Sequence, residues 1–159
     1  MGPSGQKRKD DPMISVLDAS VALKWQFRDE ESTNAATALM EDYIEGRIEL
    51  ISPTLFPYEI ISGIHVAINR KRLGEQDGYR AIGYLTSLGI ELRPFDDLVD
   101  STFRLARKYN LSPYDCAYLA LAEKEGCDFY TGDRKLFQAS QPHFPWIKWI
   151  GDYSGRGLL

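Results

Sequence analysis

The feature that most constrains the fold is a regular alternation between short apolar runs and longer segments with the composition of helices. Five runs have the length of a buried strand, and they lie at 13–17, 48–52, 90–94, 127–131 and 146–150. Strands that alternate with helices form a mostly parallel sheet with helices on both faces. We therefore expect a three-layer α/β/α fold, and the order of the strands stays open.

The helical segments carry start and stop signals. They are expected at 20–27, 33–45, 54–72, 75–87, 97–109, 114–125 and 134–139. Ser32 and Ser112 are candidate N-caps, and Pro113 suits a first helical position. Pro57 is tolerated because it falls in a first turn. Glycines at 46, 74, 89 and 126 end the segments that precede them.

The chain has 159 residues, the size of one ordinary α/β domain. Residues 1–12 are polar and non-periodic, so we expect a flexible leader, a single domain over 13–152 and a tail over 153–159. No apolar run approaches the ~20 residues of a membrane span, and the basic N-terminus has no apolar core of a signal peptide behind it. A cytoplasmic protein without a membrane partner is expected.

Cysteine and histidine give no sign of a zinc site. Cys116 and Cys127 are too few for a disulfide framework and lack CxxC spacing. Two buried, reduced thiols are expected, and a disulfide between them is left open. His65 and His143 are isolated from other candidate ligands, which favours packing or surface roles for both.

Four acids that are distant in sequence are predicted to meet at one edge of the sheet. Asp18 follows the first strand and Asp133 follows the fourth. Glu59 and Asp115 lie in the first turns of helices that begin at the same carboxyl edge. Ligand sites of parallel sheets lie beyond the carboxyl ends of the strands.

Each acid also has a structural explanation. Asp18, Asp115 and Asp133 could each cap a helix or oppose its dipole. Glu59 is harder to explain in this way, because it lies in the apolar segment LFPYEIISGIHVAI, where an unpaired acid is costly. Together the four like charges would repel one another unless a cation compensated. Hard divalent ions such as Mg²⁺ or Mn²⁺ prefer these oxygen ligands.

Carboxylate-held divalent metal favours phosphoryl chemistry. The sequence has no GxxxxGK[ST] phosphate loop and no GxSxG nucleophile elbow, which argues against an NTPase and against a serine hydrolase. The net charge of −4 does not exclude a nucleic-acid partner, since metal-binding carboxylates add to that count and each bound divalent ion cancels two charges.

Three segments resemble the PIN-domain ribonucleases, and within them the VapC toxins of prokaryotic toxin–antitoxin pairs. They are VLDASVALKW, PTLFPYEI and LSPYDCAYLALAEKEGCDFYTGDRKL, and the similarity extends from Met13 to Ile150. The resemblance implies a PIN-like fold and endonucleolytic cleavage of RNA with Mg²⁺ or Mn²⁺. It also implies a homodimer and neutralisation by a small cognate antitoxin protein.

The resemblance further implies roles for single residues. The catalytic metal ligands would be Asp18, Glu59, Asp115 and Asp133. The hydroxyls of Ser20 and Thr131 would position the acids or a bound water.

Cations and aromatic rings near the acids are candidates for RNA contact. Arg134 and Lys135 directly follow Asp133 and could hold phosphate, and Lys24 is a weaker candidate. Tyr114 and Trp25 could stack on bases, although aromatic residues at such positions are more often part of the core.

Two other classes remain open. A receiver-like signalling domain would also have an acidic Mg²⁺ pocket, with Asp96 as the phosphoryl acceptor, but Lys148 lies inside the last expected strand rather than after it, and Glu59 would have no role. A PIN scaffold that binds RNA or a partner without cleaving is the other alternative.

Overall fold

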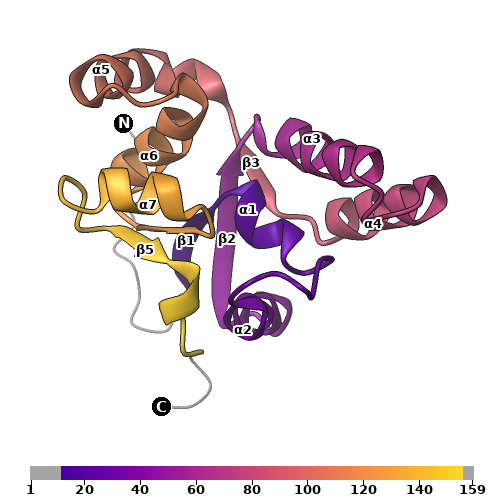
Figure 1. The fold of residues 1–159 in the computed structure, drawn as a ribbon. Coiled ribbons are helices and arrows are strands. Elements are labelled where there is room, and N and C mark those ends of the chain that lie inside the picture. The colour runs from indigo at the N-terminus through magenta and orange to yellow at the C-terminus, as the bar shows by residue number, and fades with distance from the viewer. Residues whose placement is uncertain (1–11, 156–159) are drawn as a thin grey trace.

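The computed structural model describes residues 12–155, and its centre is a five-stranded, fully parallel sheet in the order β3-β2-β1-β4-β5 (Figure 1). The strands are β1 (Met13–Leu17), β2 (Ile48–Pro53), β3 (Glu91–Arg93), β4 (Asp128–Thr131) and β5 (Ile147–Trp149). The parallel α/β prediction is confirmed. Residues 1–11 and 156–159, which include most of the predicted leader and tail, lie outside the described residues, so the domain limits stay a prediction.

Seven helices connect these strands in the described part of the chain. They are α1 (Ala19–Leu23), α2 (Thr33–Ile44), α3 (Phe56–Asn69), α4 (Glu75–Ser87), α5 (Val99–Tyr109), α6 (Pro113–Glu125) and α7 (Arg134–Ser140), with short 3₁₀ helices η1 (Phe95–Leu98) and η2 (Ile150–Asp152). The expected boundaries agree to within a few residues, except that α1 ends at Leu23 and continues as a turn. The Ser112 hydroxyl accepts a hydrogen bond from the Tyr114 amide at 3.1 Å and so caps α6, whereas Ser32 precedes α2 without a side-chain cap.

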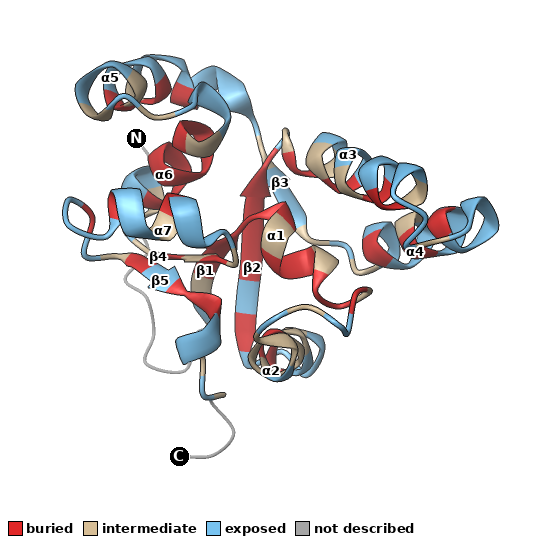
Figure 2. Cartoon of the chain, viewed as in Figure 1, coloured by how far each residue is buried: buried red, intermediate tan, exposed pale blue. Residues whose placement is uncertain are grey.

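Helix α6 is the centre of the core. Its residues from Cys116 to Ala122 are all buried, and it packs on β1, β2 and β4 with α5 against its other side (Figure 2). Tyr118 stacks on Phe129 of β4 with ring centroids 5.7 Å apart. Fully burying one large apolar side chain stabilises a fold by ~1.5–3 kcal/mol, so this helix holds its N-terminal turn firmly against the sheet.

Helices α3 and α4 form a pair beside the sheet, on the side away from α5 and α6 (Figure 1). A second, small core lies under this pair and includes Phe27, Ile64 and Ala81. The two helices approach closely at Gly78, where a Cβ atom would lie 2.7 Å from the Ile68 side chain. A larger residue here would have to displace the end of the Ile68 side chain, so glycine gives the closest packing of the two helices.

The strand order places a change of direction at the middle of the sheet. The chain runs from β1 outward through β2 to β3, and then returns past β1 to β4 and β5. Ligand crevices form where the order reverses, here at the carboxyl ends of β1 and β4. A receiver-like sheet has the order 2-1-3-4-5 with its third strand inside. Because β3 is an edge strand in this chain, the receiver alternative is wrong.

Two smaller expectations can be compared with the structure. Cys116 is buried and Cys127 is half-buried, and no disulfide joins them. No helix within residues 12–155 combines the length and the apolar character needed to cross a membrane.

Candidate functional site

Asp18 occupies the carboxyl end of β1 and is almost completely buried, with 6% of its surface exposed. Its Oδ2 accepts a hydrogen bond from the Thr131 hydroxyl at 2.6 Å. Its Oδ1 accepts from the Ser20 hydroxyl and from the Val21 amide, the latter at 3.3 Å. The carboxylate thus caps α1, as the sequence allowed. It is also held in one orientation by two hydroxyls, that of Ser20 in α1 and that of Thr131 at the end of β4.

The same two hydroxyls order the loop after β4. Ser20 Oγ accepts a hydrogen bond from the Gly132 amide at 2.8 Å, and Thr131 Oγ1 accepts one from the Asp133 amide at 3.1 Å. Asp133 is exposed and caps α7, because its Oδ1 accepts from the Leu136 amide at 3.1 Å. Ser20 and Thr131 therefore link the positions of Asp18 and Asp133.

Electrostatic interactions place all four predicted acids in one neighbourhood. Burial raises the pKa of Asp18 to about 7, against the lowering effect of its hydrogen bonds, and the charge of Glu59 raises it further. Burial raises the pKa of Asp115 to about 6, and the charges of Asp133 and Glu59 add to this effect. Carboxylates that raise one another's pKa lie close together.

Glu59 and Asp115 are half-buried and have no cationic partner among the described residues. Neither enters an ion pair with the residues that the structure describes, and Asp115 accepts no hydrogen bond from them either. A half-buried carboxylate without a partner is costly. These two groups are thus available to a ligand that the protein itself does not supply.

Tyr118 is a residue of this site that the sequence reasoning missed. Its side chain is 1% exposed, and its hydroxyl lies close to the Glu59 carboxylate in a geometry that falls short of a full hydrogen bond. Burial, together with the charges of Glu59, Asp18 and Asp115, raises its pKa. Its place one helical turn after Asp115 could have indicated this position, since residues i and i+3 share a helix face.

The donor set fits a hard divalent cation. It consists of carboxylate oxygens with hydroxyls behind them, and such oxygens are the ligands that Mg²⁺ and Mn²⁺ prefer. Burial is the main cause of the raised pKa of Asp18 and of Asp115, and a cation would offset the repulsion between the acids that adds to it. Within residues 12–155, no three carboxylates, imidazoles or thiols already converge on one point, so ligation requires side-chain rotation. Glu59 and Asp115 are only half-buried and Asp133 is exposed.

Glu59 opens onto a hollow of about 460 Å³ at the surface, which we call the acid cleft. The acid cleft is lined by α1 residues that include Ser20 and Leu23, by α3 residues around Glu59, and by Tyr114 at the start of α6. Glu59 is the member of the four acids that lines it, so the acid cleft gives solvent and ligands a route to the Glu59 carboxylate.

The three cations predicted to contact RNA have different environments. Lys24 does not fit that prediction, because it is 5% exposed and its ammonium donates to the Glu31 carbonyl oxygen at 2.7 Å. Arg134 is exposed, but its guanidinium pairs with the Glu31 carboxylate and lies over the Trp149 ring at 4.6 Å. Lys135 is exposed and enters no ion pair within the described residues.

The two aromatic residues predicted as candidates for base stacking also differ in exposure. Trp25 is 5% exposed and its indole N–H donates to the Ala36 carbonyl oxygen at 2.7 Å, so it belongs to the core and cannot stack on a base. Tyr114 is 64% exposed and lines the acid cleft.

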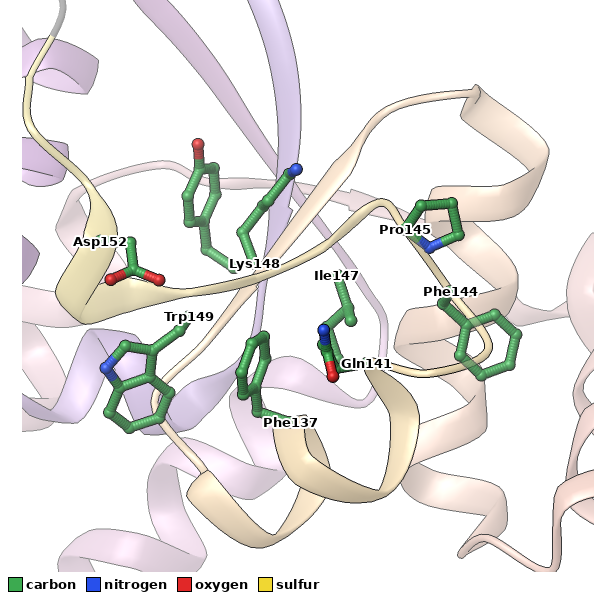
Figure 3. Close-up of a pocket in the computed structure, with 9 residues that line it drawn as sticks. Phe137, Gln141, Phe144, Pro145, Ile147, Lys148, Trp149 and Asp152 are labelled. Carbon is green, nitrogen blue, oxygen red and sulfur yellow. The ribbon is translucent and has the colours of Figure 1, made fainter.

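A further pocket of about 280 Å³ lies at the β5 edge of the molecule, between α7 and the last strand (Figure 3). Phe137, Phe144 and Trp149 surround it together with Lys148 and Asp152. None of the four acids lines it, so it is separate from the acid cleft.

The sequence is similar to known proteins over most of its length. Residues 15–141 match the PIN domain family. The chain is 32% identical to VapC ribonuclease Mb0985 of Mycobacterium bovis over 130 residues, which cover 82% of this chain and 94% of that relative. It is 29% identical to Ribonuclease VapC3 of Pyrobaculum aerophilum over 126 residues, which cover 78% and 92% of the two chains.

Solved structures share the fold. PAE2754 from Pyrobaculum aerophilum matches with a TM-score of 0.60 at 21% identity, over 87% of this chain and 92% of that one. VapBC-1 from nontypeable Haemophilus influenzae matches with a TM-score of 0.56 at 16% identity, over 86% and 96%. At these identities the likeness confirms the three-layer α/β/α architecture.

Proposed function

This chain belongs to the PIN-domain family, and from that membership we propose that it is a divalent-metal-dependent endoribonuclease of the VapC type, the toxin of a toxin–antitoxin pair. Relatives named as VapC ribonucleases, similar over nearly their whole length, support the reaction class. The acid cleft supports the chemistry independently of those names.

The observation that carries the proposal is the pair of half-buried, uncompensated carboxylates of Glu59 and Asp115 beside the buried Asp18. A structural role would have given these groups a partner, because a fold gains nothing from burying unpaired charge. A metal-binding role explains why the charge is left uncompensated by protein groups. It also argues against a PIN scaffold that has lost activity.

In this proposal Asp18, Glu59, Asp115 and Asp133 hold Mg²⁺ or Mn²⁺. A bound divalent cation supplies Lewis acidity to the phosphodiester and lowers the pKa of the attacking water. Ser20 and Thr131 fix the Asp18 carboxylate by hydrogen bonds, so that this ligand is oriented before the substrate arrives. Lys135, and Arg134 once it leaves Glu31, hold phosphate groups of the RNA near the acids.

The proposal includes the assembly of the protein. RNA is the substrate, a cognate antitoxin protein is the inhibitor, and two copies of the chain form a homodimer in the cytoplasm, where the RNA is. Light scattering on the purified chain tests the dimer, and co-purification with the product of a neighbouring gene tests the antitoxin.

Cleavage of total RNA by the purified chain tests the reaction. Cleavage should require Mg²⁺ or Mn²⁺, stop in EDTA and return when the ion is added in excess. Asp115→Asn should abolish it with the far-UV circular dichroism unchanged, whereas Asp97→Asn should retain it, because exposed Asp97 only pairs with Lys124 at 3.2 Å. Activity that persists in EDTA or in Asp115→Asn would overturn the metal assignment, and mapping the cleaved ends would identify the target sequence.

A further inference from the structure

A second hollow lies beside the acid cleft, and we call it the aromatic cleft. Its volume is about 430 Å³, and it lies between the start of α3, the start of α6 and η1. Three aromatic rings line it, those of Tyr58, Tyr114 and Phe95, with Leu55 and the Thr54 hydroxyl beside them.

The two clefts adjoin each other. Leu55, Tyr58 and Tyr114 line both of them. Tyr58 directly precedes Glu59 and Tyr114 directly precedes Asp115. Successive helical residues point about 100° apart, so each tyrosine lies beside the carboxylate that follows it, on the wall that the two clefts share. A molecule with a phosphate at the acids thus has its next group at the aromatic cleft.

The aromatic cleft keeps its rings exposed. Tyr58 is 74% exposed, Tyr114 is 64% exposed and Phe95 is 39% exposed. Rings of this size are normally buried, and exposed ones that gather in a hollow mark a binding surface. No charged side chain lines the cleft, so it is suited to a neutral, flat group and not to phosphate.

We propose that the aromatic cleft binds one unstacked nucleobase of a single-stranded RNA, next to the phosphodiester that is cut. A nucleobase is flat and neutral and has polar edges, which the hydroxyls of Tyr58, Tyr114 and Thr54 can meet. Proteins that read single-stranded RNA stack splayed bases on aromatic rings in this way. The inference rests on the proposed ribonuclease function, and it adds that the RNA must be unpaired at the cleavage site.

The shape of the cleft favours a base over a second protein chain. A volume of about 430 Å³ lies within the ~300–1,000 Å³ range of small-ligand pockets, which suits one nucleotide and excludes a double helix. A stable interface between proteins covers ~800 Å² on each partner, a far larger surface than one hollow. The aromatic cleft is continuous with the acid cleft, and its occupant should therefore be part of the substrate.

RNA binding by single-residue variants tests the proposal. All variants carry Asp115→Asn, so that affinity is measured without cleavage, and the probes are fluorescent eight-nucleotide oligo(A) and oligo(U), each alone and in a duplex with its complement. Tyr58→Ala and Tyr114→Ala should each weaken single-strand binding about tenfold or more, the loss of one base–ring stack. Tyr58→Phe and Tyr114→Phe keep the ring and should stay within about threefold. Tyr79→Ala is the matched control, because Tyr79 is 69% exposed on α4 and lines neither cleft.

Other outcomes would overturn the proposal. Alanine variants that bind single strands as well as the Tyr79→Ala control would remove the base site. An Asp115→Asn protein with both tyrosines intact that binds the duplex as tightly as the single strand would do the same. If light scattering showed that the alanine variants change from dimer to monomer, the cleft would be an interface between copies instead.

The failure of this inference can be told apart from the failure of the ribonuclease proposal. Cleavage of total RNA by the unsubstituted chain, measured with Mg²⁺ or Mn²⁺, tests the reaction alone. An unsubstituted chain that cleaves RNA, while the tyrosine variants bind the single strands without loss, retains the proposed function and loses only the base site. A chain that neither binds the oligonucleotides nor cleaves RNA loses both.

Discussion

Replacing Asp18 by Asn should stabilise the metal-free protein while abolishing its activity. Burial raises the pKa of the Asp18 carboxyl from 3.8 to about 7, so folding is penalised whenever this group is ionised. At 1.36 kcal/mol for each pKa unit, the difference corresponds to ~4 kcal/mol as an upper limit. The Asn side chain forfeits part of the hydrogen bonding from Thr131, Ser20 and Val21, which costs ~1–2 kcal/mol. The expected net gain in the free energy of unfolding is ~2 kcal/mol at pH 8.

The pH dependence follows from the direction of the pKa change. Below pH 3.8 the carboxyl of Asp18 is protonated in both the folded and the unfolded chain, so it contributes nothing. Between 3.8 and about 7 the folded chain keeps a proton that the unfolded chain has lost, and stability falls as the pH rises. The penalty is complete above about 7. Asp18→Asn should lack this part of the slope and keep the smaller part due to Asp115, whose pKa is about 6.

Urea unfolding followed by tryptophan fluorescence, at pH 5 and pH 8 in EDTA, measures this effect. The gain of Asp18→Asn in the free energy of unfolding should be larger at pH 8 than at pH 5. In thermal unfolding at pH 8, the substitution should raise the melting temperature by ~4–8 °C. Asp133→Asn is the matched control, because Asp133 is exposed and should lose at most the ~1 kcal/mol of a helix cap at either pH. Adding Mg²⁺ at a hundred times its dissociation constant should stabilise the parent by ~2.7 kcal/mol and leave Asp18→Asn unmoved. An Asp18→Asn protein that is less stable than its parent at pH 8 in EDTA would refute the reasoning.

Three further substitutions test single contacts. Thr131→Val removes the buried hydrogen bond to Asp18 and should lower the free energy of unfolding by ~1–3 kcal/mol in urea titrations, whereas Thr131→Ser, which keeps the hydroxyl, should cost less. Tyr118→Phe should leave the free energy of unfolding unchanged or raise it by up to ~1 kcal/mol, because the hydroxyl beside Glu59 makes no full hydrogen bond. A decrease in the free energy of unfolding would show that the hydroxyl is hydrogen-bonded. Lys135→Ala should leave the melting temperature unchanged and reduce the salt dependence of RNA affinity by about one unit of the log–log slope; an unchanged slope would remove Lys135 from the phosphate contacts.

Local sequence was sufficient to predict the elements and the edge of the sheet where the acids meet. The run at 13–17 became β1, and Ser112 with Pro113 began α6 as their chemistry requires. The carboxyl ends of parallel strands necessarily share one edge, so Asp18 and Asp133 could be placed together without knowing which strands are neighbours. The strand order was beyond this reasoning, because it depends on long-range packing of α6 across three strands.

The environment of long side chains was not predictable for the same reason. Lys24 was taken for a surface cation, yet its stem packs over Gly132 and its ammonium is held by the Glu31 carbonyl oxygen. For Trp25, base stacking and a place in the core were both open. Its hydrogen bond to the Ala36 carbonyl oxygen places it in the core. Both outcomes depend on the path of the loop after α1, and that segment has no periodic pattern from which the path could be predicted.

The sequence left open whether each aspartate caps a helix or binds a metal. One aspartate can do both. Asp133 caps α7 with its Oδ1, and its Oδ2 accepts no hydrogen bond from residues 12–155. Asp18 has three donors on its two oxygens and is therefore fixed, while Glu59 and Asp115 are only half-buried and can turn. One rigid ligand and several adjustable ones suit a hard cation that must also accommodate a phosphate. Loss of the Thr131 hydroxyl should then weaken metal binding through the orientation of Asp18, and loss of the Glu59 carboxylate should weaken it by removing a ligand outright.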